Sequence, residues 1–207
     1  MAAYISFYSK TPNPKHLHEA AEVLHGGGIV IFPTDTVYGL GCLSSSVKGL
    51  ERFAKIKEVK LEHAPLSFLF RDIKELSQYV APMNSQTFKL VKKLLPGPYA
   101  LILHAPNKLP KPFQKRKTIG VRISNHPVLQ ALLPLLDAPL ITSSLHDPDE
   151  IIDYTTDPEN LFARWESKID LMLSDGYGSN IPSTVIDLTT DPFELIRAGA
   201  GEIPNEL

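Results

Sequence analysis

The feature that most constrains this chain is a short apolar run that ends at a proline. Residues 29–32 (Ile-Val-Ile-Phe) are uniformly apolar and mostly β-branched, which is typical of a buried strand. Pro33 cannot donate a backbone hydrogen bond, so we expect the strand to end before it. Four polar side chains follow closely, namely Thr34, Asp35, Thr36 and Tyr38. The C-terminal end of a buried strand is where α/β sheets usually place a ligand, although taken alone this segment is more simply a locally satisfied turn.

Composition limits the class of protein. The 207 residues are 43% hydrophobic and 21% charged, which is ordinary for a globular chain with a sizeable core. The 21 Lys and Arg against 23 Asp and Glu give a net charge of −2, so the chain as a whole has no bias toward nucleic acid, while a local basic face stays possible. Cys42 is the only cysteine and is expected to be a packed side chain in a reducing compartment. Without a signal sequence or a long apolar run, the sequence predicts a soluble, cytoplasmic protein that does not enter the membrane.

Strands and helices alternate along the chain, but at irregular spacing. We expect helices at residues 14–25, 47–57, 72–79, 85–95, 127–136 and 161–169, the first with Asn13 as its N-cap. We expect strands within 1–10 and at 29–32, 66–70, 99–104, 119–123, 140–142, 171–173, 183–188 and 194–197. Some neighbouring strands look like hairpins, which favours a mixed sheet in an α/β (α+β) fold. No repeat or linker interrupts the pattern, so residues 1–207 are expected to form a single domain.

Seven short motifs occur in a fixed order. They lie at 33–41 (Pro-Thr-Asp-Thr-Val-Tyr-Gly-Leu-Gly), 96–98, 120–122 (Gly-Val-Arg), 126–127, 139–144, 182–187 and 195–199. Together they resemble the YrdC/Sua family of threonylcarbamoyl-adenylate synthases over about residues 28–200, and their details are most similar to the YciO branch. The resemblance implies a YrdC-like fold, in which a twisted mixed β-sheet flanked by helices carries a concave, partly basic ligand pocket.

The resemblance also implies a reaction. Synthases of this family combine ATP, L-threonine and bicarbonate into threonylcarbamoyl-AMP, which serves the modification of tRNA to threonylcarbamoyladenosine. A carbamate oxygen must attack the α-phosphate, so cations have to offset the phosphate charge and the nucleophile has to be held in line. The sequence contains no His/Cys cluster with metal-ligand spacing, so Mg²⁺ is expected to arrive with the nucleotide.

Site residues are implied by their match to the family motifs. The catalytic positions are Lys57 and Arg122. The substrate-binding positions are Thr34, Thr36, Tyr38, Arg122, Thr142 and Ser183. The ATP-binding positions are Lys57, Lys60, Thr118, Ser144 and Arg197. Arginine suits these roles because its planar fork binds carboxylate and phosphate in a bidentate way. Each residue alone also has a simpler interpretation: a helix-end lysine, a paired arginine, a capping hydroxyl or, for Tyr38, packing instead of stacking.

The sequence departs from the synthases at three places in the expected site. The synthases carry Lys-x-Arg-Pro after the first helix of the pocket, whereas residues 57–60 read Lys-Glu-Val-Lys. They carry Ser-x-Asn where residues 144–146 read Ser-Leu-His, with His146 expected in a solvated loop. Leu69 stands where some of them have a pocket histidine. We therefore expect any synthase activity to be weaker than that of members with the complete motifs.

A second hypothesis is a binding module for double-stranded RNA or tRNA. Six basic residues fall within fifteen positions without an intervening acid: Lys108, Lys111, Lys115, Arg116, Lys117 and Arg122. Prolines in the same stretch should hold it extended. We expect the RNA-binding residues Lys111, Lys115, Arg116 and Lys117 to point outward, and Arg122 inward; a merely solvated loop is the alternative. A third possibility is a carbamoyl-transfer domain as in hydrogenase maturation proteins. It is disfavoured because the zinc and acylphosphatase segments that accompany such a domain are not found in this sequence.

Overall fold

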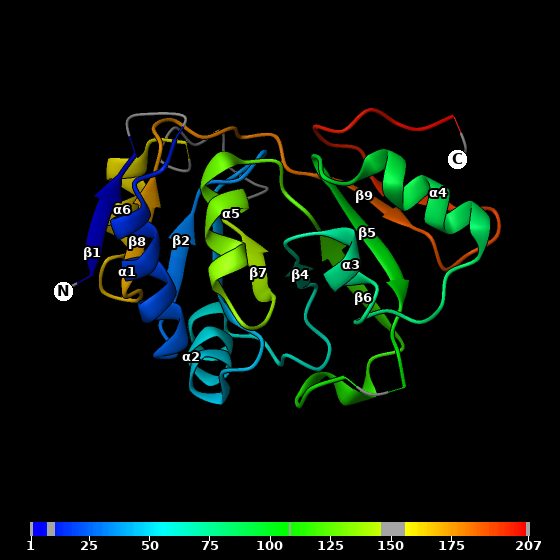
Figure 1. Ribbon diagram of the computed structural model, residues 1–207, viewed down its shortest axis with the longest axis horizontal. Coiled ribbons are helices and arrows are strands. Elements are labelled where there is room, and N and C mark those ends of the chain that lie inside the picture. The colour runs from blue at the N-terminus through cyan, green and yellow to red at the C-terminus, as the bar shows by residue number, and fades with distance from the viewer. Residues whose placement is uncertain (1, 8–10, 108, 146–155, 206–207) are drawn as a thin grey trace.

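The computed structural model describes residues 2–7, 11–107, 109–145 and 156–205, and its framework is one ten-stranded sheet (Figure 1). The strand order is β1-β8-β2-β3-β7-β4-β6-β5-β9-β10. The strands span Ala3–Ser6 (β1), Val30–Phe32 (β2), Gly39–Leu43 (β3), Ser67–Leu69 (β4), Tyr99–His104 (β5), Thr118–Arg122 (β6), Leu140–Ser144 (β7), Leu171–Ser174 (β8), Thr184–Asp187 (β9) and Glu194–Arg197 (β10). Parallel pairs such as β4 with β6 adjoin antiparallel pairs such as β3 with β7, so the predicted mixed sheet is confirmed.

The helices begin and end where the sequence provides caps. They span Pro14–His25 (α1), Val47–Lys57 (α2), Ile73–Leu76 (α3), Ser85–Leu94 (α4), Pro127–Leu132 (α5) and Pro158–Trp165 (α6), with 3₁₀ turns at Phe113–Lys115 (η1) and Leu133–Leu135 (η2). The Asn13 side chain accepts a hydrogen bond from the Lys15 backbone amide, as its N-cap position predicts. None of the helices in the described part of the chain has the length and hydropathy needed to cross a bilayer.

Two apolar clusters lie on the opposite faces of the sheet. Val30 and Phe32 of β2 join α1 and α5 in one cluster, while Ile29 and Ile31 join α2, α4 and α6 in the other. This alternation follows from the two-residue period of a strand, and it explains why the run at 29–32 has no polar member. In Figure 1 the N-terminal strand lies at one end of the sheet and the C-terminal segment at the other.

The strand β3 was not predicted. Residues 39–43 (Gly-Leu-Gly-Cys-Leu) contain two glycines, which favoured a turn, yet all five residues are buried between β2 and β7. The glycines are needed for close approach, because a Cβ on Gly39 would lie 2.8 Å from Cε2 of the Phe32 ring. Phe32 therefore fills the space that side chains on β3 would occupy. Cys42 of this strand is buried in the core, as expected.

Candidate functional site

A cavity of about 430 Å³ lies over the middle strands and contains most of the predicted site. Six residues expected to bind substrate or ATP line it: Thr118, Arg122, Thr142, Ser144, Ser183 and Arg197. They come from β6, β7, β10 and the segment before β9, which are far apart in sequence and are brought together by the sheet order. Neither Asp nor Glu is among the described residues that line this cavity. The lining therefore offers cations and hydroxyls, which suits an anionic ligand.

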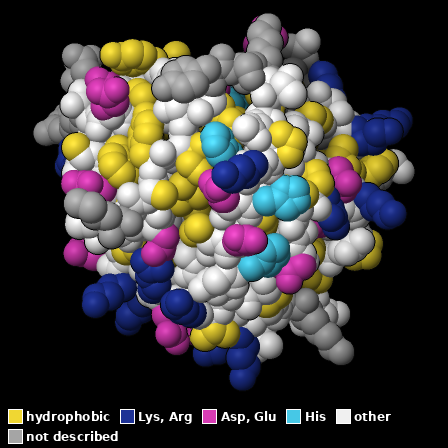
Figure 2. Space-filling model, turned by 60° about the vertical axis from the view of Figure 1, so that its left-hand side comes forward, with side chains coloured by type: hydrophobic (Ala, Val, Ile, Leu, Met, Phe, Trp, Pro, Cys, Tyr) yellow, Lys and Arg dark blue, Asp and Glu magenta, His cyan; other side chains and the backbone are white. Residues whose placement is uncertain are grey.

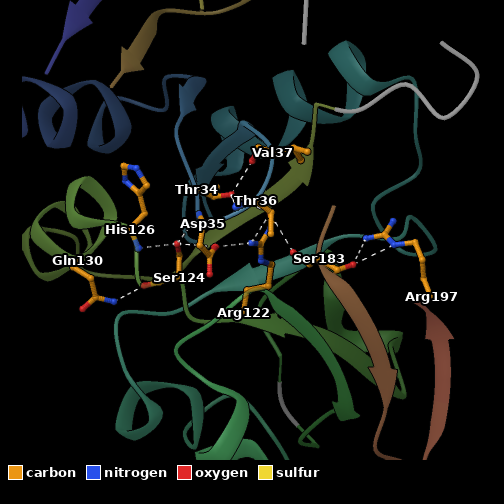
Figure 3. Close-up of polar contacts among 10 residues, drawn as sticks. All are labelled: Thr34, Asp35, Thr36, Val37, Arg122, Ser124, His126, Gln130, Ser183 and Arg197. Carbon is orange, nitrogen blue, oxygen red and sulfur yellow. Dashed lines mark hydrogen bonds and ion pairs between the residues drawn. The ribbon is translucent and has the colours of Figure 1, made fainter. Parts of the chain in front are cut away.

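Arg122 and Asp35 form the buried centre of the site (Figure 3). Arg122 Nη2 donates to Asp35 Oδ1 over 3.0 Å and to Thr36 Oγ1 over 3.2 Å, and both charged side chains are only 6% exposed. Burial lowers the pKa of the Arg122 guanidinium, and the Asp35 carboxylate acts in the opposite direction. A substrate carboxylate at Arg122 would consequently share the guanidinium with Asp35.

Hydroxyl groups extend this centre toward the second arginine of the cavity. Thr36 Oγ1 lies 3.3 Å from Ser183 Oγ and 3.2 Å from Thr34 Oγ1. Arg197 Nε and Nη2 donate to the Ser183 carbonyl over 3.2 and 2.8 Å, and burial lowers the pKa of this guanidinium. Figure 3 shows these side chains as one continuous set of contacts between Asp35 and Arg197. Thr34 and Thr36 thus support the cavity wall from behind Arg122 and do not line it.

Besides Thr34 and Thr36, three further predicted ligand residues do not line the cavity, namely Tyr38, Lys57 and Lys60. Tyr38 is 1% exposed, its hydroxyl donates to the Gly176 carbonyl over 2.6 Å, and burial raises its pKa to about 12. The expected substrate contact of Tyr38 is therefore corrected: the ring packs in the core. Lys57, half-buried at the end of α2 with its pKa lowered by burial, and the exposed Lys60 are not among the residues that line the cavity. Their nucleotide roles stay predictions.

The basic residues of the segment between β5 and β6 do not all point outward. Lys111, Lys115 and Lys117 are exposed, as predicted. Arg116 is not directed outward: its Nη2 donates to the Leu61 and Ala64 carbonyls, and it lines the cavity. The predicted outward position of Arg116 is thus wrong, because the Leu61 and Ala64 carbonyls hold its guanidinium against the turn at residues 61–64. Lys108 and His146 lie outside the described residues.

Two features of the site were missed at the level of single residues. The sequence places Asp35 in a polar turn after the strand but does not identify it as the partner of Arg122. Ser124 was not considered, although its Oγ donates to Asp35 Oδ1 over 2.9 Å. The available signal for Asp35 was its place between two threonines directly after a buried strand. Leu69, by contrast, is simply a buried core residue next to the site strand β6.

A second, larger cavity of about 520 Å³ lies toward the β1 end of the sheet. His126 Nε2 is 2.7 Å from Asp175 Oδ2 in its wall, while His126 Nδ1 accepts from the Val128 amide at the start of α5. No Lys or Arg is among the described residues that line it. Figure 2 turns this end of the molecule toward the viewer and shows basic side chains mainly at its margins. An anionic ligand is therefore expected in the first cavity and not in this one.

The comparison with protein families decides the relationship. Residues 22–199 match the model of the Sua5/YciO/YrdC family, which carries the description "Telomere recombination". The chain belongs to this family. The residues that match the Sua5/YciO/YrdC model include all three arginines of the cavity, Arg116, Arg122 and Arg197. It confirms the resemblance seen in the seven motifs.

Individual relatives agree with the family assignment. The protein named "Uncharacterized protein YciO" from Escherichia coli strain K12 is 34% identical over 206 residues, 98% of each chain, and the crystal structure of E. coli YciO has a TM-score of 0.87 over 98% of both chains. The human threonylcarbamoyl-AMP synthase is 29% identical over 191 residues, 88% of this chain and 67% of that protein. A P. abyssi Sua5 complexed with L-threonine shares the fold, with a TM-score of 0.82 and 24% identity over 96% of this chain and 57% of that one. The expected YrdC-like fold is confirmed.

Proposed function

We propose that this protein is a threonylcarbamoyl-AMP synthase-type enzyme that uses ATP, L-threonine and bicarbonate and acts in the cytoplasm in tRNA modification. Support comes from its kinship with proteins named threonylcarbamoyl-AMP synthase and from the L-threonine complex of a Sua5 with the same fold. The observation that carries the proposal is the 430 Å³ cavity, where six expected ligand residues meet and no Asp or Glu is among the described lining residues.

The proposed chemistry divides the cavity between two tasks. The threonine amine and bicarbonate give a carbamate with loss of one water molecule. One of the carbamate oxygens then bonds to the α-phosphorus of ATP, and the bond from that phosphorus to the bridging oxygen breaks as pyrophosphate leaves. Arg197 would offset phosphate charge, since its fork is fixed by the Ser183 carbonyl. Arg122, held by Asp35, would orient the carboxylate of threonine. Lys57 and Lys60 remain in the proposal as cations outside the lining.

Magnesium would enter with the nucleotide. No group of three or more His, Cys, Asp or Glu side chains suited to a metal ion occurs among the described residues, and the cavity lining adds no carboxylate. These residues fit an ion held by phosphate oxygens and water, and not one held by a protein cage.

The test is pyrophosphate release from ATP with each amino acid, in the presence and absence of bicarbonate. We expect release that requires both L-threonine and bicarbonate and is slow beside synthases with complete motifs, because Val59 stands at the arginine position of Lys-x-Arg. Pyrophosphate release with a different amino acid, and not with threonine, would mean that this other amino acid is the substrate. Absence of release with every amino acid would refute the enzymatic proposal.

A second candidate function is supported by a different observation. Lys111, Lys115 and Lys117 are exposed on the segment that also supplies Arg116 and Thr118 to the cavity, and among the described residues none of the three forms an ion pair within 4.0 Å. Unpaired lysines on an exposed segment suit the phosphates of a structured RNA. We therefore propose double-stranded RNA or tRNA as a macromolecular partner, through contacts outside the cavity.

A further inference from the structure

Three arginines line the 430 Å³ cavity, and their charges are not balanced alike. Arg122 is paired with the Asp35 carboxylate. Arg116 and Arg197 bond only to backbone carbonyls, and neither forms an ion pair among the described residues. With no Asp or Glu in the described lining, two positive charges face this cavity without a counter-charge. A ligand with at least two negative charges would supply it.

Arg116 is the less expected of the two. Its Nη2 donates to the Leu61 carbonyl over 2.6 Å and to the Ala64 carbonyl, and its guanidinium carbon lies 5.7 Å from the centre of the Phe113 ring. These contacts fix the orientation of the side chain. Its Nε is buried without a hydrogen-bond partner in the described structure, and Nη1 makes none of the described hydrogen bonds. The guanidinium is thus held in place with Nη1 still available as a donor, while the buried Nε lacks a partner.

The charge of Arg116 is only partly compensated by its two carbonyl partners. Burial lowers the pKa of Arg116, which means that its charged form is partly desolvated at this position. Two neutral carbonyls offset this cost less well than an anion does, because an anion adds the attraction between opposite charges to the hydrogen bonds. If the only role of Arg116 were to hold the turn at residues 61–64, its loss would weaken the binding of ligands of every charge to the same extent.

We propose that Arg116 is a ligand-contacting residue that selects polyphosphate charge in this cavity, so that the site distinguishes a nucleoside triphosphate from a monophosphate or a nucleoside. This inference rests on the proposed nucleotide site but adds a residue to it. Arg116 reaches the cavity from the segment between β5 and β6 and lies against the turn at residues 61–64, beyond the end of α2. With Arg116 in the cavity, the described basic residues that remain exposed on this segment for a contact with RNA are the three lysines Lys111, Lys115 and Lys117.

The experiment compares ATP, AMP and adenosine binding by calorimetry in four proteins: wild type, Arg116→Met, Arg116→Lys and the control Lys89→Met. Lys89 is exposed on α4 and does not line the cavity, so it tests the effect of losing one positive charge elsewhere on the molecule. We expect Arg116→Met to weaken ATP binding by roughly 10- to 100-fold, AMP by less and adenosine by less than about 2-fold. Arg116→Lys should be intermediate because it keeps the charge and loses the fork. The control should stay within about 3-fold of wild type for ATP.

Each outcome decides the inference. Equal losses for ATP, AMP and adenosine would mean that Arg116 only shapes the turn, and unchanged ATP binding would remove it from the site; both overturn the inference and leave the proposed function standing. Inorganic tripolyphosphate is titrated in parallel. Arg116-dependent tripolyphosphate binding without ATP binding would support the inference and contradict the proposed function. Binding of neither ligand by the wild type would overturn both. Retained adenosine binding verifies that a variant is folded.

Discussion

At the scale of single residues, the site depends on a buried ion pair that no local pattern identifies. Asp35 follows β2 and Arg122 ends β6, 87 positions apart, yet Nη2 and Oδ1 are 3.0 Å apart. Ser124 adds a hydrogen bond to the same carboxylate oxygen, and its Oγ accepts from the His126 amide over 3.2 Å. Since burying charges costs more than a single pair recovers, the pair is better explained by positioning Arg122 than by stability.

Removing one partner of this pair should be costly. Asp35→Ala leaves Arg122 buried without its counter-charge, and we expect the free energy of unfolding to fall by about 3–5 kcal/mol. Glu19→Ala provides the matched control, because it breaks the exposed Lys15–Glu19 pair, which should matter by less than about 1 kcal/mol. Urea unfolding measures both. Similar losses in the two variants would show that the buried pair is not a special feature of the fold.

The core thiol gives a prediction for alkaline pH. Burial raises the pKa of Cys42 from 9.0 to about 12, so the folded state keeps the proton more tightly than the unfolded state. Its contribution is complete below pH 9 and is lost as pH rises toward 12; at pH 10.5 the loss should be about 2 kcal/mol. Cys42→Ala should therefore lose less stability than wild type between pH 8 and 10.5 in urea unfolding. Parallel declines would show that the thiol does not titrate as its burial implies.

At the scale of elements, the sequence predicts those helix ends that local caps determine. The helix Val47–Lys57 was predicted with its observed ends, and α1 begins at Pro14 as its Asn13 cap indicates. The predicted helix at 127–136 is shorter, because Pro134 belongs to a separate 3₁₀ turn after α5. The strand at Gly39–Leu43 was missed because a glycine's preference for turns is local, whereas the ring of Phe32 that makes these glycines necessary packs against them through β2–β3 pairing.

That close approach can be tested with two glycines. A Cβ on Gly41 would lie 2.8 Å from the Ile141 carbonyl oxygen and 2.9 Å from Cε1 of Phe32, so Gly41→Ala should destabilise the fold by about 1–3 kcal/mol. A Cβ on Gly26 would meet its nearest neighbours at 3.4 Å, so Gly26→Ala should be nearly neutral or slightly stabilising. Thermal unfolding compares the two. A neutral Gly41→Ala would mean that β3 can move away from β2 without loss.

At the scale of the whole molecule, the cavity is a product of sheet order. Thr118, Thr142 and Ser183 come together because β7, β4, β6, β5 and β9 are successive neighbours, an arrangement that sequence periodicity does not contain. The resemblance to a family identified these residues; the physics of single segments did not. The same limit explains the error at Arg116, whose inward position depends on carbonyls more than fifty residues away.

The three exposed lysines between β5 and β6 should make the affinity for RNA depend on salt concentration. The triple variant Lys111/Lys115/Lys117→Ala should lower the slope of log affinity against log salt for double-stranded RNA by roughly three units. The matched control is Lys55/Lys74/Lys89→Ala, which removes the same charge from other exposed positions. Fluorescence anisotropy at several salt concentrations measures the slopes. Equal slopes for the two variants would mean that only the net charge of the protein matters, and would contradict the proposed RNA contact.

The nucleotide site is tested most directly by titrating ATP into wild type and Arg197→Met by calorimetry. Arg197 is anchored to Ser183 at the cavity wall, and loss of its charge-assisted contact should reduce ATP affinity by about 1.5–3 kcal/mol, roughly 10- to 150-fold. Adenosine binding should change little, because the contact is to phosphate. Equal ATP affinity in the two proteins would contradict the assignment of this cavity as the nucleotide site.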